Sequence, residues 1–77
     1  MKKKSKLIAV ITTSKLHFER YVNEHRLQFS EVKQVQVLSD IKGIIFDYAV
    51  QVDGSENVTQ YVIDRVQTTK SLTIKEE

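Results

Sequence analysis

The sequence predicts a small α/β domain in which one sheet of three or four strands packs against two helices. Three observations indicate this class. Of the 77 residues, 23 are Val, Ile or Thr, which favour strands. Residues 7–11 are all apolar, as expected for a strand that is buried on both faces of a sheet. Two later segments, 15–26 and 58–66, place apolar residues at the spacing of an amphipathic helix.

The first half of the chain is expected to form strand, helix and strand. After the strand at 7–11 comes the triplet 12–14, whose hydroxyl groups can cap a helix. That helix is predicted from Lys15 to about Arg26. Its apolar side carries Phe18, Tyr21, Val22 and His25. Alternation of valine with glutamine then predicts a second strand near residues 32–38.

The second half is expected to form a turn, a strand and a helix. Ser39 and Gly43 have the positions of an N-cap and a left-handed stop around one helical turn. The third strand follows, with one apolar face and one partly wet face. Its apolar face carries Ile44, Phe46, Tyr48, Val50 and Val52. Its partly wet face carries Ile45, Asp47, Ala49, Gln51 and Asp53.

A turn at 53–55 separates this strand from the second helix. Asn57 and Gln60 have the spacing of a capping box at the start of that helix, which is predicted to end near Thr68. Its inner side is expected to carry Val58, Tyr61, Val62, Arg65 and Val66. Leu72 and Ile74 predict a short last strand within 71–75.

The predicted order β-α-β-β-α, with an optional last strand, fits two architectures. One is a Rossmann-like half-domain, in which the first two strands are parallel through a helical crossover. The alternative is a ferredoxin-like β-α-β-β-α-β sandwich. The helical turn at 39–43 favours the first, because it can redirect the chain into a parallel strand. The half-wet third strand favours the second.

Charge is distributed unevenly along the chain. The formal net charge is +2, but residues 1–6 contain four lysines, so that the rest of the chain carries −2. We therefore expect a basic, flexible tail over 1–6 and a single α/β domain over 7–75. The absence of cysteine excludes disulfides and thiolate metal sites. The apolar run at 7–11 is too short for a secretory signal, and no segment approaches the roughly 20 apolar residues of a membrane span, so we expect a cytoplasmic protein without membrane contact.

A contact with an anion or another ligand is predicted where the first strand meets the first helix. The carboxyl end of a strand and the amino end of a helix meet there, and both favour an anion. The residues concerned are Thr12, Thr13, Ser14 and Lys15. The chain has only two isolated glycines, so it carries no glycine-rich phosphate loop, and ordinary helix capping is the preferred interpretation.

No catalytic, cofactor or metal site is predicted. Ser14 and His17 are three residues apart, but nothing in the sequence orients the histidine or supplies an oxyanion hole. His17 and His25 are eight residues apart, whereas chelation on one helix uses i, i+4 spacing.

Nucleic-acid binding is the alternative function that the sequence suggests. Lys42 and Gly43 precede Phe46 and Tyr48, a loose match to the aromatic strand of RNA-recognition motifs. Core packing of the two rings is the preferred interpretation. The candidate phosphate contacts are Lys2, Lys3, Lys4, Lys6 and Lys42.

The layout also resembles small accessory proteins of bacteriophages and mobile elements. The resemblance rests on five segments, which are Ile11-Thr-Thr-Ser14, Phe18-Glu-Arg-Tyr-Val-Asn-Glu-His25, Val37-Leu-Ser-Asp-Ile-Lys-Gly43, Phe46-Asp47 with Val50-Gln-Val-Asp53, and Tyr61-Val-Ile-Asp-Arg65. It implies a minimal Rossmann-like domain without enzymatic activity in a bacterial host cell, and it transfers no catalytic residue.

From these observations we expect a small non-enzymatic protein that binds, and modulates or inhibits, a macromolecular partner. A protein partner is favoured, and a second copy of the chain is one candidate, because so small a core gains from a partner surface. Binding of nucleic acid through the lysines and the Phe46/Tyr48 strand is the alternative.

Overall fold

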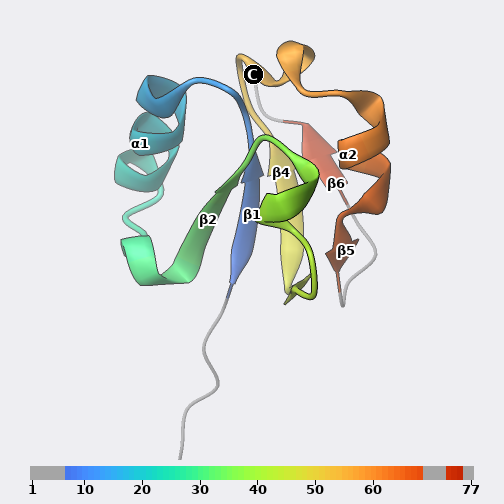
Figure 1. The fold of residues 1–77 in the computed structure, drawn as a ribbon. Coiled ribbons are helices and arrows are strands. Elements are labelled where there is room, and N and C mark those ends of the chain that lie inside the picture. The colour runs from blue at the N-terminus through green and yellow to red at the C-terminus, as the bar shows by residue number, and fades with distance from the viewer. Residues whose placement is uncertain (1–6, 69–72, 76–77) are drawn as a thin grey trace, which may run out of the picture.

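The computed structural model describes residues 7–68 and 73–75, which form a central sheet with helices on both of its faces (Figure 1). The elements in chain order are β1 (Ile8–Ile11), α1 (Lys15–Glu24), the 3-10 turn η1 (Phe29–Glu31), β2 (Val32–Val35), the 3-10 turn η2 (Leu38–Asp40), β3 (Ile45–Phe46), β4 (Tyr48–Gln51), the 3-10 turn η3 (Ser55–Asn57), α2 (Gln60–Arg65), β5 (Gln67–Thr68) and β6 (Thr73–Lys75).

The main sheet has the strand order β2-β1-β4-β6, and each neighbouring pair is parallel. β1 lies between β2 and β4, with Ile8 opposite both Val32 and Tyr48. All four residues of β1 are fully buried, which explains why its sequence is apolar without alternation. A second, two-stranded parallel sheet pairs β3 with β5.

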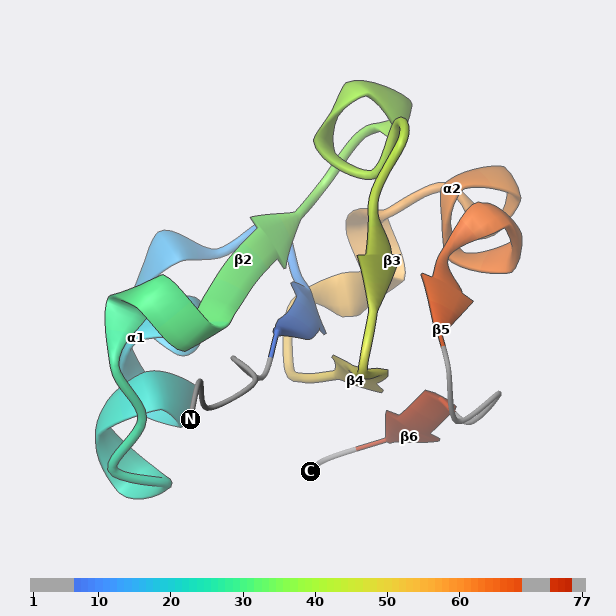
Figure 2. The same cartoon turned by 90° about the horizontal axis from the view of Figure 1, so that it is seen from below.

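Each face of the main sheet carries its own hydrophobic core. In Figure 2, which looks along the sheet, α1 covers one face, while η2, β3 and α2 cover the other. The α1-side core contains Ile8, Val10, Tyr21, Val22, Val32, Val50 and Val52. The α2-side core contains Ala9, Ile11, Val35, Ile41, Phe46, Ala49, Val58 and Val62. Successive residues of β1 therefore serve opposite cores, as the two-residue period of a strand requires.

These observations confirm the small α/β class and the parallel arrangement. The ferredoxin-like alternative is wrong, because its sheet would be antiparallel, whereas the strand pairs seen here are parallel. The optional last strand is present as β6, which pairs with β4.

The predicted third strand is in fact two strands, and the expected division of its faces is wrong. The break falls at Asp47, whose carboxylate accepts a hydrogen bond from the Leu7 N–H at 2.6 Å and whose own N–H donates to the Leu7 carbonyl at 2.8 Å. This anchor bends the chain, so that Phe46 packs in the α2-side core while Tyr48 packs against the α1-side core. Ala49, expected on a partly wet face, is fully buried.

Three local predictions also need correction. The first helix ends at Glu24 and not near Arg26, which has a left-handed φ of 55°. The capping box of Asn57 and Gln60 is absent, because Asn57 belongs to η3 and the helix begins only after Thr59. The second helix is also shorter than predicted, since it ends at Arg65 and β5 follows.

Ser39 does not cap the turn before β3, because it lies inside η2. Asp40 takes that role, since its carboxylate accepts hydrogen bonds from the N–H groups of Gln36 at 2.8 Å and Val37 at 3.1 Å. Gly43 has the predicted left-handed conformation, with a φ of 74°.

Candidate functional site

The predicted ligand contact at the carboxyl end of β1 is occupied by the protein's own backbone. The Thr12 hydroxyl donates to the Asp53 carbonyl at 2.8 Å, and the Thr13 hydroxyl donates to the Gly54 carbonyl at 2.9 Å. Thr12 also accepts the Ser14 N–H at 3.1 Å. The ring of His17 also contacts the Asp53 carbonyl, as described next. We call all of these contacts together the edge latch. It joins the end of β1 to the turn that follows β4.

The ring of His17 completes the edge latch. Its Nδ1 lies 2.8 Å from the Asp53 carbonyl oxygen, and because a carbonyl only accepts, Nδ1 must carry the proton. The Ser14 hydroxyl accepts the His17 backbone N–H at 3.2 Å, which confirms Ser14 as the N-cap of α1. The Ser14 hydroxyl is thus bonded to the His17 backbone, and the His17 ring is bonded to the Asp53 carbonyl.

Close packing at Gly54 leaves little room for a ligand beside the edge latch. A Cβ at this position would lie 2.9 Å from the Thr12 hydroxyl oxygen and 3.1 Å from Nδ1 of His17. The crevice between β1 and β4, where ligands bind in open parallel sheets, is therefore filled at this point. The predicted anion contact of Thr12, Thr13, Ser14 and Lys15 stays a prediction that this geometry disfavours, and Lys15 is exposed nearby.

The aromatic strand offers no base-stacking surface. Phe46 is fully buried, and Tyr48 is half-buried against the opposite core. The two rings therefore lie on different faces of the main sheet. Of the predicted phosphate contacts, Lys42 is exposed, whereas Lys2, Lys3, Lys4 and Lys6 lie outside the described residues.

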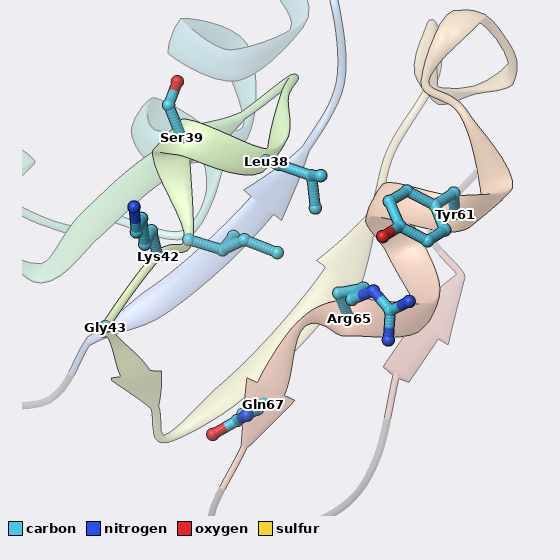
Figure 3. A pocket seen from close by; sticks show the side chains of 8 residues that line it. Leu38, Ser39, Lys42, Gly43, Tyr61, Arg65 and Gln67 are labelled. Carbon is cyan, nitrogen blue, oxygen red and sulfur yellow. The ribbon is translucent and has the colours of Figure 1, made fainter.

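A groove of about 500 Å³ opens on the α2 side of the molecule, between η2 with its following turn and α2 with β5 (Figure 3). We call it the front groove. The residues that line it and matter most are Leu38, Ile41, Lys42, Tyr61, Arg65 and Gln67. In Figure 3 the Leu38 side chain and the Tyr61 ring approach one another across it.

The front groove combines cationic and apolar surface. Lys42 stands on the η2 side and Arg65 on the α2 side, while no Asp or Glu is among its described lining residues. The Arg65 guanidinium carbon lies 4.3 Å from the centroid of the Tyr61 ring, a cation–π contact. The acids nearest in sequence are engaged elsewhere: Asp40 with backbone N–H groups, and Asp64 with the Gln60 side chain at 2.8 Å.

Exposed apolar groups gather in and beside the groove. Tyr61 is 51% exposed and Leu38 is 39% exposed, although the helical pattern placed Tyr61 and Arg65 on the inner side of the second helix. Ile45 of β3, at 62%, is also exposed. The sequence signal for the groove was the Tyr61–Arg65 pair at i, i+4, where neighbouring side chains meet on a helix surface.

The fold and the groove together define a small parallel α/β domain with a groove on its surface. Comparison with protein-family models, curated proteins and solved structures finds no match for this chain. Within residues 7–68 and 73–75, no group of three His, Asp, Glu or Cys residues is placed to hold a metal ion. In the same part of the chain, no helix has the length and apolar character needed to cross a bilayer.

Proposed function

We propose that this protein is a small non-enzymatic binding module that holds a protein partner against the front groove and thereby modulates or inhibits it. The observation that carries the proposal is the combination of exposed Tyr61 and Leu38 with the cations Lys42 and Arg65 in one concave surface. Tyrosine and arginine are the residues that most often dominate protein–protein binding energy.

The proposal favours binding over catalysis because of how the one suggested nucleophile–base pair is used. The Ser14 hydroxyl bonds to the His17 backbone N–H and the His17 ring bonds to the Asp53 carbonyl, so the described chain shows no hydroxyl–imidazole contact of the kind that activates a nucleophile. The front groove offers Lys42 and Arg65, which suit recognition of negative charge.

A protein partner is favoured over a nucleic acid for two reasons. The buried Phe46 ring cannot stack on a base. One face of the Tyr61 ring is covered by Arg65. The alternative of nucleic-acid binding rests on Lys42, which lines the groove, and on the four lysines of residues 1–6.

The resemblance to accessory proteins of phages and mobile elements adds a cellular location and a class of target to the proposal. We place the protein in the cytoplasm of a bacterial host cell, where its target is a host or phage protein. Association of two copies is a further part of this hypothesis, since a domain of this size gains stability from a partner surface.

Site-specific photo-crosslinking in the native host tests the proposal. A photoreactive amino acid replaces Leu38 at the groove, and a control carries it in place of Arg20, an exposed residue of α1. We expect a discrete protein adduct from position 38 that is absent from position 20 and is lost when Arg65→Glu is added. Equal adducts from both positions, or none from position 38, would contradict the proposal. An adduct with nucleic acid would support the alternative.

A further inference from the structure

We infer that the front groove takes an extended acidic peptide segment that also carries one large apolar side chain. The inference rests on the proposed function, namely that the partner is a protein, and adds the chemistry of the part that enters the groove. In this arrangement, carboxylates of the segment meet Lys42 and Arg65, and the apolar side chain packs against Leu38 and Tyr61.

The two cations are ready to receive carboxylates. Neither Lys42 nor Arg65 has an acidic partner among residues 7–68, so binding would break no ion pair there. The Arg65 guanidinium carbon lies 4.3 Å from the centroid of the Tyr61 ring. A guanidinium has five N–H donors, and because those of Arg65 meet no acid within residues 7–68, they can bind a bidentate carboxylate.

The same contact reduces the entropic cost of binding. Arginine carries large rotamer entropy, and a side chain that already rests on an aromatic ring loses less of it when a ligand arrives. Arg65 is thus the better ordered of the two cations. Lys42 lies on the η2 side, and Figure 3 shows its side chain directed away from Arg65 and Tyr61, so that the two cations stand at opposite margins of the front groove.

The apolar part of the groove accounts for the second requirement. Leu38 and Tyr61 are partly exposed, and Ile41 beside them is 7% exposed and belongs to the α2-side core. A volume of about 500 Å³ lies within the range of sites that enclose a small ligand, so it accommodates a few side chains and not a folded surface. An extended segment fits this size.

The charges of the groove and of the domain favour an acidic peptide over a nucleic acid as the occupant. Binding of a phosphate backbone depends on several cations along one path, whereas only two line this groove among the described residues. Residues 7–77 together carry −2, which opposes a polyanion more than it opposes a short segment with one or two carboxylates.

Fluorescence anisotropy with the whole protein tests the inference. The probes are a labelled short peptide with acidic residues around one leucine, the same peptide with lysine in place of each acid, the same peptide with serine in place of leucine, and a labelled oligothymidylate. We expect the acidic, leucine-containing peptide to bind at least about tenfold more tightly than each of the others, since each change removes charge-assisted bonds or apolar burial.

Matched variants locate the binding site. Lys42→Gln and Arg65→Gln should each weaken the acidic peptide about tenfold, while Arg20→Gln on α1 should leave its affinity unchanged. All three side chains are exposed, and circular dichroism confirms that each variant is folded. Affinity that is indifferent to both groove variants would overturn the inference.

The remaining outcomes separate this inference from the proposed function. If none of the peptides binds while position 38 still crosslinks a protein in the host, the acidic segment is wrong and the protein-binding function stands. Tighter binding of the oligothymidylate than of any peptide would overturn both.

Discussion

Polar side chains at the carboxyl edge of the sheet are bonded within the protein, whereas those of the front groove are exposed to solvent. At the edge, Thr12 and His17 both bond to the Asp53 carbonyl, and Gly54 packs against them without spare room. In the groove, Lys42 and Arg65 face solvent without acidic partners in the described chain. The edge is where parallel sheets usually bind ligands, yet here its polar groups bond to the protein itself, and we propose binding at the front groove instead.

The two left-handed glycines provide the largest expected contrast between these regions. Gly54→Ala should lower the free energy of unfolding by about 2–4 kcal/mol, because a left-handed φ and a Cβ only 2.9 Å from the Thr12 hydroxyl oxygen both oppose it. Gly43→Ala should cost about 1 kcal/mol, since its φ is also positive but nothing lies within 4 Å of the new Cβ. Urea denaturation followed by circular dichroism measures both. Equal losses would show that the edge latch is not tightly packed.

Removing one hydroxyl of the edge latch should have the next largest effect. Thr12→Val keeps the shape of a fully buried side chain but leaves the Ser14 N–H without its acceptor, so we expect a loss of about 1–3 kcal/mol. Thr59 is exposed and its hydroxyl makes no cap hydrogen bond, so Thr59→Val should change the free energy of unfolding by less than about 0.5 kcal/mol. Peptide affinity should be equal in the two folded variants. A lower affinity for Thr12→Val alone would mean that the two regions are coupled.

Substitution of Asp40 tests whether η2, which forms one side of the front groove, depends on the hydrogen bonds of this residue. Asp40→Ala removes the acceptor for the Gln36 and Val37 N–H groups and should cost about 0.5–2 kcal/mol, as loss of a capping residue does. It should also weaken the acidic peptide, because η2 forms one side of the groove. Faster amide hydrogen exchange at residues 36 and 37 would report the loosened wall. Asp64→Ala, which removes only a contact with the Gln60 side chain, is the control.

The smallest expected effect on stability belongs to the groove itself. Lys42→Gln should change the free energy of unfolding by less than about 0.5 kcal/mol, because an exposed lysine without an ion pair among the described residues contributes little. The same variant should bind the acidic peptide about tenfold more weakly. Thermal denaturation and anisotropy on one preparation give both values. A stability loss as large as that of Thr12→Val would remove the distinction between the two regions.

Local patterns in the sequence were sufficient where one element decides the outcome. The apolar block of β1 and the helical period of α1 are both properties of a single segment, and each appears close to its predicted place. The triplet 12–14 provides the cap of α1 as expected, through Ser14, and Gly43 has its left-handed conformation. The groups involved are close in sequence, so propensity and spacing describe them well.

The sequence could not predict features that depend on distant partners. The break between β3 and β4 depends on the contact of Asp47 with Leu7, 40 residues earlier. The sequence on either side of Asp47 keeps the strand pattern, in which one face is apolar and the other partly polar, so it gives no sign of the break. Helical spacing predicts Tyr61 and Arg65 on the inner side of the second helix, but a helix of six residues buries only a narrow strip, around Val62. The front groove depends on the placement of η2 beside α2, which no local pattern of the sequence encodes.

The central position of β1 between two parallel neighbours has a consequence for how quickly the chain folds. Parallel pairs cannot form by a hairpin, so each pairing must close a loop that includes a whole crossover segment. Of the two pairs that β1 makes, the one with β2 closes the shorter loop, since it brings residues 8–11 to residues 32–35, whereas β4 begins only at Tyr48. We therefore expect β1 and β2 to form the folding nucleus and the domain to refold more slowly than a helical bundle of equal length. Stopped-flow refolding of Val35→Ala should show most of its destabilisation in the folding rate, whereas in Val62→Ala it should fall on the unfolding rate.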